Sequence, residues 1–311
     1  MAKVAVTGVS SFTGSSIARA LREAGHDVVG VCTKAHFTAY AGTLAGRRLA
    51  RAVKAGVVLE YGITAEDDRL ANWIESQKFD VYVHHHHYMT DFRSPDYDLT
   101  RALAVGLAPL PRLARALEKS VSRGIIYSTT YFESLGKDVS PYGYSKGEVG
   151  RLLAELSRSA KLPFSKIVIG NPIGPLENED RLIPGLIRSC VAGKPYDLRS
   201  PSAITYPVPI SVLTKTYVKA VEDLLRGAAP DVASPSLGPF ENLSFAKTVL
   251  KDLIEARLKL VPATLALPDK ETTSTPRPFV PANVDCDWAA FWDFYAKEFE
   301  SEFQPRRSPT T

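Results

Sequence analysis

Two residues four positions apart, Tyr142 and Lys146, have the types and the spacing for a proton-transfer site. On a helix they would lie on one face, about 6 Å apart at Cβ. A free tyrosine has a pKa of about 10 and exchanges protons poorly at neutral pH, but a neighbouring ammonium lowers that pKa. A hydroxyl from Ser128, Thr129 or Thr130, which end a short apolar run, would complete the site.

The first thirty residues predict a unit that would place a cofactor beside this pair. A buried strand at 3–7 leads into a loop that Gly8 and Gly14 bracket, a helix follows, and a second strand spans 27–32. This is a βαβ unit. Glycines in its first turn let the backbone approach a pyrophosphate, to which the helix N-terminus offers amides and partial positive charge.

Strands and helices keep alternating to residue 170, which predicts an α/β fold, a Rossmann-like doubly wound parallel sheet. The further expected strands are 57–60, 80–84, 124–128 and 165–169, and the expected helices are 43–54, 65–77, 98–119 (interrupted near Pro109 and Pro111) and 142–160. Such sheets bind ligands at the carboxyl ends of their strands. The loop 8–14, the run His84–His87 and the run Ser128–Thr130 all fall there, so we expect one site.

After Asn171 prolines become dense and the alternation stops. Helices are expected at 182–191, 211–225, 242–257 and 288–301, the last with aromatic residues spaced to dock on the core. We interpret residues 1–170 as the dinucleotide-binding domain, 171–303 as a smaller C-terminal substrate lobe and 304–311 as a frayed tail. The proline-rich stretch 261–281 is expected to be an ordered loop or a linker.

Composition restricts the function classes. The chain has 311 residues, 45% hydrophobic and 23% charged, which is typical of a globular protein with a sizeable core. Its net charge of +4 is well short of the clustered basic charge of a nucleic-acid binder. No apolar stretch approaches the ~18 residues of a membrane span. Three cysteines without metal-like spacing fit a reducing compartment, and the N-terminus lacks signal-peptide features, so we expect a cytoplasmic protein.

Four segments resemble the extended short-chain dehydrogenase/reductase family. Residues 7–14 look like its Thr-Gly-x-x-Gly-x-x-Gly fingerprint, and residues 141–146 match its Pro-Tyr-x-x-Ser-Lys motif. Ser128–Thr130 fall at its Ser/Thr cluster, and residues 171–175 resemble the Asn-x-x-Gly-Pro segment that opens its substrate lobe. The resemblance covers roughly residues 3–225. Many members are epimerases, dehydratases or reductases that act on nucleotide-activated sugars.

The resemblance implies roles for individual residues. Tyr142 would be the general acid/base, Lys146 would hold the nicotinamide ribose and depress the tyrosine pKa, and Thr130 would hydrogen-bond the reacting oxygen. The hydride would come from NAD(P), because no protein side chain carries one. The further cofactor-binding candidates are Gly8, Ser10, Ser11, Phe12, Thr13, Gly14, Thr33, Lys34, Gly62, Ile63, His84, His85, His86 and Ser128. The substrate-binding candidates are His87, Thr129, Thr130, Asn171, Arg181, Arg188 and Arg199, the arginines because their forks suit a diphosphate.

The end of the second strand departs from the family pattern. Cys32-Thr33-Lys34 stand where an acidic residue would bind the adenosine ribose hydroxyls. A lysine attracts a 2′-phosphate that an acid would repel, so NADP is favoured over NAD. Arg47 and Arg48 would either add to this or form a solvated helix face.

The four consecutive histidines do not predict a metal site. Neighbouring residues on a strand point to opposite faces, and the sequence places no acidic or cysteine partner beside them. By resemblance, His84 ends its strand, and His86 and His87 line the nicotinamide and the substrate. Either they take part in substrate binding or proton transfer, or they are packed or solvent-facing imidazoles.

The leading hypothesis is NAD(P)-dependent hydride transfer on a nucleotide-activated sugar, as a 4-keto reductase or an epimerase. Lys34 favours the reductase, and Tyr131-Phe132 in place of Asp-Glu argue against a dehydratase. Reduction of a non-sugar ketone or aldehyde is the second hypothesis. The third is a non-catalytic dinucleotide sensor, favoured by Ser11, Gly62 and Leu103, which replace expected cofactor contacts. By analogy with relatives we expect a homodimer.

Overall fold

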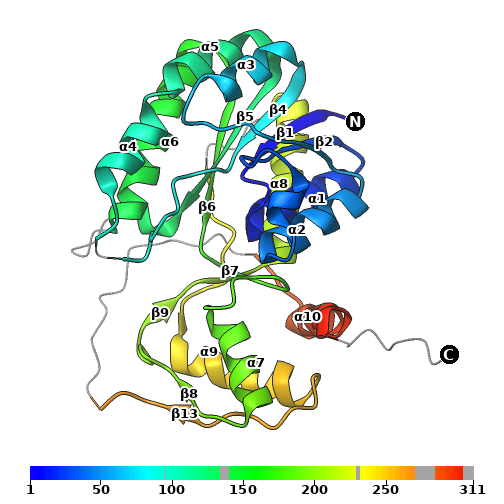
Figure 1. Ribbon diagram of the computed structural model, residues 1–311, viewed down its shortest axis with the longest axis vertical. Helices are drawn as coiled ribbons and strands as arrows, with labels where there is room; N and C mark the ends of the chain where they lie inside the picture. The colour runs from blue at the N-terminus through cyan, green and yellow to red at the C-terminus, as the bar shows by residue number, and fades with distance from the viewer. Residues whose placement is uncertain (95, 134–139, 229–231, 270–283, 304–311) are drawn as a thin grey trace, which may run out of the picture.

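The computed structural model describes residues 1–94, 96–133, 140–228, 232–269 and 284–303, and the chain forms two lobes (Figure 1). The expected tail at 304–311 and residues 270–281 of the proline-rich stretch lie outside the described residues. No helix in the described ranges is long and apolar enough to cross a bilayer.

Within the described residues, seven parallel strands form the sheet of the first lobe in the order β11-β6-β5-β4-β1-β2-β3. They are β1 Lys3–Thr7, β2 Asp27–Val31, β3 Val58–Glu60, β4 Phe79–His84, β5 Val121–Thr130, β6 Phe164–Ile169 and β11 Val232–Ala233. The strand order reverses between β1 and β4, which creates a crevice for ligands at the carboxyl ends. The expected doubly wound α/β fold is confirmed.

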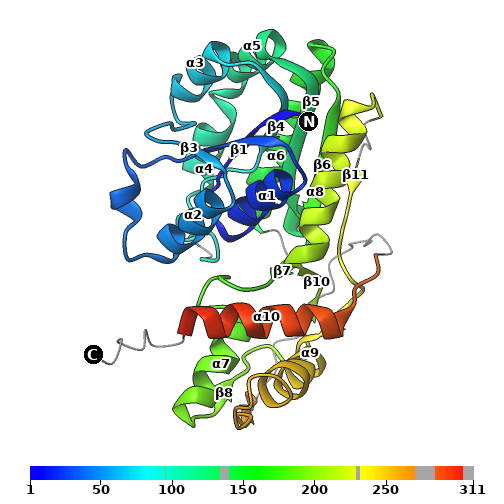
Figure 2. The same ribbon diagram turned by 90° about the vertical axis from the view of Figure 1, so that its right-hand side faces the viewer.

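Helices cover both faces of this sheet (Figures 1 and 2). One face carries α1 Phe12–Glu23, α2 Leu44–Lys54 and α8 Ile210–Leu225, and the other carries α3 Arg69–Ser76, α4 Leu99–Leu107, α5 Leu110–Ser120 and α6 Pro141–Ser159. Val4 and Val6 pack in the first core and Ala5 in the second, since side chains of a strand alternate between faces.

The helical region 98–119 is interrupted as expected: α4 ends at Leu107 and α5 begins at Leu110, with Pro109 at the N-cap position of α5, because proline does not continue a helix. One strand differs from its expected bounds. Strand β5 runs to Thr130 instead of ending at Ser128. The whole Ser128–Thr130 run is therefore held by the sheet, which fixes the position of its hydroxyls.

The second lobe is built on short strand pairs and an aromatic core. Its strands are β7 Asn171–Ile173, β8 Tyr196–Asp197, β9 Ile204–Thr205, β10 Pro207–Pro209, β12 Phe240–Glu241 and β13 Leu265–Ala266, and its helices are α7 Leu182–Ala192, α9 Asn242–Val249 with the π-helical η3 Leu250–Glu255, and α10 Trp288–Phe303. Phe291, Trp292 and Tyr295 of α10 are buried against Phe245 and Leu253. The docking role expected for this helix is what the structure shows.

The chain returns to the first lobe after entering the second. Helix α8 buries Leu213, Tyr217 and Val221 against α1 and the sheet, and β11 pairs with β6 at the sheet edge. The stretch 171–303 is thus not one continuous substrate lobe, because the apolar face of α8 covers the sheet that the first 170 residues leave open.

Candidate active site

Helix α6 places Tyr142 and Lys146 on its first two turns. It begins with Ser140, whose hydroxyl accepts a hydrogen bond from the Gly143 amide, and with Pro141, whose missing N–H is not needed there. A Cβ on Gly143 would lie 2.2 Å from the carbonyl oxygen of Phe132 in η2 Tyr131–Glu133, so a glycine is required for this close approach. The sequence therefore fixes the helix start directly beside the end of β5.

Aromatic rings enclose the Tyr142 side chain. Its ring centroid lies 5.1 Å from that of Phe92, 5.6 Å from His87 and 6.2 Å from Tyr97, and the Lys146 ammonium lies 5.9 Å from it. Burial, assisted by Tyr97, raises the pKa of Tyr142 above its usual value. Burial also lowers the pKa of Lys146 to about 8, against the opposing charge of Glu133. The expected depression of the tyrosine pKa is wrong for this structure, because burial favours the neutral form of both groups.

The three hydroxyls at the end of β5 have different partners. Ser128 is fully buried and accepts a hydrogen bond from the Tyr217 hydroxyl at 2.7 Å, and Thr129 donates to the Glu133 carboxylate at 2.6 Å. Thr130 accepts from the Phe132 amide and donates to no group in the described part of the chain. Ser128 also donates to no group among the described residues, but it is 0% exposed, whereas Thr130 is 8% exposed. Thr130 is thus the better placed of the two to offer its hydrogen to a ligand.

The four histidines spread from the sheet core to Tyr142. His84 packs between Tyr82 and Tyr127, with the His86 ring 4.2 Å from its own. His85 Nε2 lies 2.7 Å from Thr13 Oγ1, which connects this run to α1. His87 Nε2 lies 2.8 Å from Ser145 Oγ; because that hydroxyl donates to the Tyr142 carbonyl, His87 must donate through Nε2–H.

All four imidazoles are neutral at physiological pH. Burial, with the nearby Lys146 charge, lowers the pKa of His85 to about 3 and that of His86 to about 4. The pKa values of His84 and His87 lie well below the usual range, chiefly through burial. The run therefore offers neutral donors and acceptors, not positive charge. Among the described residues no three His, Cys, Asp or Glu side chains form a cluster that could hold a metal ion.

The glycine loop after β1 fits a dinucleotide. Gly8 has φ +70°, and a Cβ on Gly14 would lie 2.2 Å from the Gly8 carbonyl oxygen, so both positions need glycine. Ser11, in place of the middle glycine, has extended backbone and caps α1 by accepting from the Gly14 amide at 3.0 Å. The amides of Phe12 and Thr13 have no partner inside the helix and are available to a pyrophosphate.

The loops after β2 and β3 lie side by side, as a binding site for the adenosine end requires. The amides of Gly62 and Ile63 donate to the carbonyls of Lys34 and Cys32, at 2.9 and 3.1 Å. The exposed Lys34 side chain donates to the Ala39 carbonyl at 2.9 Å and lies 4.8 Å from the Tyr40 ring. Lys34 is thus an exposed residue after β2 whose ammonium is held by the Ala39 carbonyl.

Helix α2 uses its arginines to hold the second lobe. Arg48 is 7% exposed, and its guanidinium donates to the Leu176 carbonyl at 2.9 and 2.7 Å and to Asn178 Oδ1 at 2.7 Å. Arg47 pairs with Glu179 at 3.6 Å. The sequence predicted that these arginines either contact a 2′-phosphate or form a solvated helix face. Both predictions are wrong for Arg48, because its guanidinium donates hydrogen bonds to the second lobe.

A cavity of about 450 Å³ lies at the junction of the lobes. It is lined by aromatic, apolar and amide side chains together with four charged ones, among them Tyr131, Phe132, Asn171, Ile183, Tyr206, Asn242 and Phe245. Asn171 Oδ1 accepts from the Thr205 hydroxyl and the Tyr206 amide, at 2.8 and 3.1 Å. Those bonds orient the Asn171 amide.

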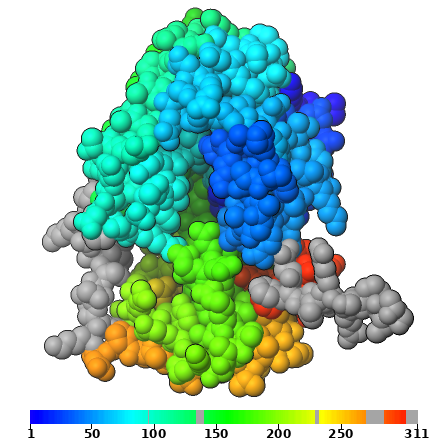
Figure 3. Space-filling view, viewed as in Figure 1, coloured from blue at the N-terminus to red at the C-terminus, as the bar shows by residue number. Residues whose placement is uncertain are grey.

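The surface of the first lobe is hollowed between the blue β1–α2 part and the cyan β4–α4 part (Figure 3).

The three candidate diphosphate arginines have different positions. Arg181 lines the cavity and pairs with the buried Glu177 at 3.4 Å. Arg188 does not line it and donates to the Glu179 carbonyl. Arg199 does not line it either; its side chain is 89% exposed and pairs with Asp197 at 3.8 Å. The structure thus brings Arg181 to the site and not the other two.

The site residues that were not predicted include Glu177 and Asp180, which line the cavity, Arg93, which lines it from the other lobe, and the Tyr142 neighbours Phe92 and Tyr97. Burial raises the pKa of Glu177 to about 7, with Arg181 opposing. The sequence around Phe92 and Arg93 carries no periodicity or motif. Their position one loop after a strand-end histidine was the available signal, since such loops border the ligand crevice.

Comparisons with known proteins agree with this geometry. Residues 4–205 match the model of the NAD dependent epimerase/dehydratase family. No curated protein matches the sequence. The fold resembles a UDP-glucuronic acid 4-epimerase from Bacillus cereus and a UDP-glucose 4-epimerase from Thermotoga maritima, each with 15% identity, a TM-score of 0.72 and coverage of 97% of this chain and 100% of the other. It also resembles a UDP-N-acetylglucosamine 4-epimerase from Methanobrevibacter ruminantium, with 15% identity, a TM-score of 0.74 and coverage of 97% and 99%.

The fold and the glycine loop define a dinucleotide-binding protein of the Rossmann type. Since the family model matches well over half of the chain, the protein belongs to the NAD dependent epimerase/dehydratase family. The resemblance inferred from the four sequence segments is confirmed.

Proposed function

We propose that this chain catalyses hydride transfer at a sugar carbon of a nucleotide-activated sugar, as an NAD(P)-dependent epimerase. The observation that carries the proposal is the placement of the Tyr142 phenol, the Lys146 ammonium and the Thr130 hydroxyl at the same sheet edge as the glycine loop. The structural neighbours solved with UDP-sugars and NAD support the substrate class.

The chain's own residues manage a proton while the bound dinucleotide supplies the hydride. With its raised pKa, Tyr142 is protonated at neutral pH and can give its proton to an alkoxide oxygen. Thr130 can donate a hydrogen bond to the same oxygen, since its own hydrogen is not otherwise used within the described residues. An epimerase needs the reverse step as well, in which Tyr142 takes the proton back and the Lys146 ammonium stabilises the phenolate.

A keto reductase that uses NADPH is the second candidate. Two observations favour it: Lys34 stands where an acid would exclude a 2′-phosphate, and the protonated Tyr142 is poised for reduction. We also propose NADP as the preferred form of the cofactor, a homodimer as the assembly and the cytoplasm as the location. Analytical ultracentrifugation tests the dimer, because a homodimer should sediment with twice the mass of one chain.

The test of function is Tyr142→Phe, assayed on a panel of nucleotide-sugars by chromatography of the products and by nicotinamide absorbance. Loss of the proton donor should lower turnover about 10²–10⁴-fold while dinucleotide binding persists. Tyr144→Phe, on the same helix but outside the site, is the matched control and should retain activity. Turnover by Tyr142→Phe within a few-fold of the wild-type value would show that this mechanism is wrong.

A further inference from the structure

The cavity at the lobe junction contains two arginines with very different partners. Arg181 comes from the second lobe and pairs with Glu177, whose side chain is 1% exposed. Arg93 comes from the first lobe, in the segment after β4, and pairs with Asp180 across the junction. The side chains of Arg93 and Asp180 are 50% and 61% exposed.

The partners of the two arginines determine which of them can more easily bind an incoming anion. Taking Arg181 away from Glu177 would leave a buried carboxylate with the neutral donors of Gly174 and Tyr295, which is unfavourable. Separating Arg93 from Asp180 leaves Asp180 in water, where exposed pairs hold each other weakly. A diphosphate presents a denser charge and a better fork geometry to a guanidinium than one carboxylate does. Arg93 is therefore the cavity arginine that exchanges its partner most readily.

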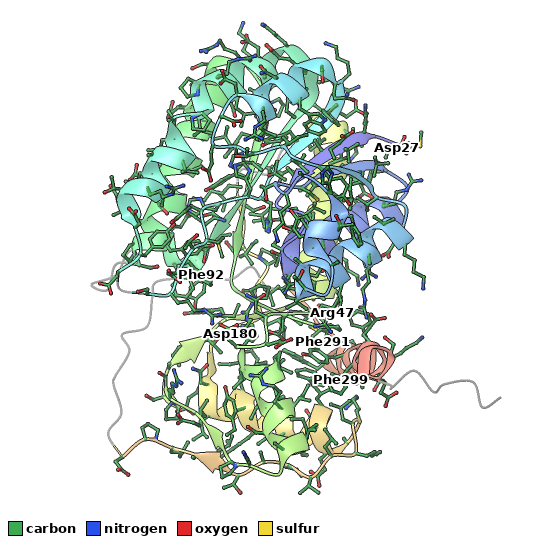
Figure 4. All side chains as sticks on the ribbon, viewed as in Figure 1. Asp27, Arg47, Phe92, Asp180, Phe291 and Phe299 are labelled. Atoms are coloured by element: carbon green, nitrogen blue, oxygen red, sulfur yellow. The ribbon has the colours of Figure 1, made fainter. Side chains whose placement is uncertain are left out.

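Arg93 is also connected to the proton-transfer residue. Its guanidinium lies 5.2 Å from the ring of Phe92, and that ring lies 5.1 Å from the ring of Tyr142. Phe92 and Asp180 lie on the two sides of the junction between the lobes (Figure 4). A ligand that holds Arg93 would also hold Phe92 over Tyr142, so recognition of the diphosphate would help to position the aromatic cover of the reacting group.

We propose that Arg93 binds the diphosphate of the substrate, and that the Asp180 carboxylate occupies the guanidinium only until a diphosphate displaces it. This inference rests on the proposed function, because it assumes a nucleotide-activated substrate. It adds the residue that recognises the diphosphate, and it places that residue in the lobe that carries Tyr142. Asp180 becomes a competitor of the substrate and not a contact.

Calorimetric titration of the full chain with UDP, dTDP, GDP and ADP, each paired with its nucleoside, tests the proposal. The nucleoside diphosphate that binds the wild-type protein most tightly is then titrated into each variant. Arg93→Ala should weaken its binding at least tenfold and leave nucleoside binding unchanged. Asp180→Asn should tighten its binding about threefold or more, because the competing charge is gone. Arg199→Ala, another exposed arginine paired with an aspartate but outside the cavity, is the matched control and should change nothing.

The outcomes separate this inference from the proposed function. If no diphosphate binds the wild-type protein, the proposed function fails and the inference fails with it. If a diphosphate binds the wild type and Arg93→Ala equally well, Arg93 is not its ligand and the proposed function stands. If Asp180→Asn binds the diphosphate as tightly as the wild type or more weakly, Asp180 does not compete with the diphosphate for Arg93. Unchanged thermal unfolding of each variant confirms that the fold is intact.

Discussion

The site has two regions in which buried ionisable groups have different partners. Around Tyr142, burial leaves the phenol and four imidazoles neutral and lowers the pKa of Lys146 to about 8. Around Glu177, buried groups have polar or charged partners: Glu177 pairs with Arg181, and Arg48 donates to the Leu176 carbonyl and to Asn178. The first region keeps protons to transfer. In the second region Arg48, with a pKa of about 10, keeps its charge, and the pKa of Glu177 is about 7.

The difference follows from what lies beside each buried group. Aromatic rings surround Tyr142 and offer no charge to oppose desolvation, so the neutral form wins. At the lobe junction Arg181 faces Glu177, and the Leu176 carbonyl faces Arg48, so these partners offset part of the desolvation penalty. Burial and the partner together therefore set the protonation state: burial still raises the pKa of Glu177 to about 7 against the charge of Arg181.

Removing the cation of the second region should give the largest change in stability. Arg48→Met removes a buried guanidinium and leaves the half-buried Leu176 and the exposed Asn178 without their donor. We expect the free energy of unfolding to fall by about 3 kcal/mol. Urea denaturation followed by circular dichroism measures it. Arg19→Met, which removes an exposed pair with Glu23, is the control and should change stability by less than about 1 kcal/mol.

A fall for Arg48→Met no larger than for Arg19→Met would remove the contrast between the two regions. It would mean that water replaces the Arg48 guanidinium at the junction without loss of stability.

The pH dependence of Glu177 gives the next largest effect. Its folded pKa of about 7 lies above its ordinary value of 4.5, so the folded state binds this proton more tightly than the unfolded state does. The stability that this proton provides is complete below pH 4.5 and is lost as the pH rises through 7. Glu177→Gln should remove that loss, so its stability relative to wild type should rise on the order of 2 kcal/mol between pH 4.5 and 8.

The difference between the two proteins must be measured, because the histidines act in the opposite direction. Their folded pKa values lie below 6.5, so their protonation destabilises the fold as the pH falls through that value. That contribution is common to wild type and Glu177→Gln and cancels. A constant difference across the range would mean that the folded pKa of Glu177 is not raised above its ordinary value.

The exposed Lys34, outside both regions, should show the smallest effect. Lys34→Glu places an acid at the proposed ribose site, where it would repel a 2′-phosphate and accept from ribose hydroxyls. We expect the ratio of NADPH to NADH affinity to fall roughly tenfold. Fluorescence titration measures both affinities. Lys54→Glu makes the same charge change on α2 and should leave the ratio unchanged; an equal shift would assign the effect to overall charge.

The sequence predicts local and repeated features of this molecule well. The glycine loop, the alternation to residue 170 and the Tyr142–Lys146 spacing depend on neighbours along the chain, and the structure contains all three. The return of α8 to the sheet was not predicted, because an apolar helix face does not say which core it covers. Arg48 stands among basic residues that are typical of a solvated helix face. Its partner Leu176 lies 128 residues further along the chain, so the local sequence does not indicate the contact.

The raised pKa of Tyr142 was missed for a related reason. The spacing to Lys146 is visible in the sequence, and the rings of Phe92 and Tyr97 that bury the phenol are not. Charge proximity can be counted from residue numbers, whereas desolvation depends on the whole fold.

The segments that pass between the lobes contain prolines. Strands β7 and β10 run side by side there, with Pro172, Pro207 and Pro209, and Leu237 and Ser236 bond to the backbone of this crossing. Proline fixes φ, so these crossings have few torsions through which one lobe can tilt against the other. The lobes then behave as a stiff frame whose opening is set by the side chains across the junction. Substrate would enter by exchanging those contacts one at a time, without a swing of the whole second lobe.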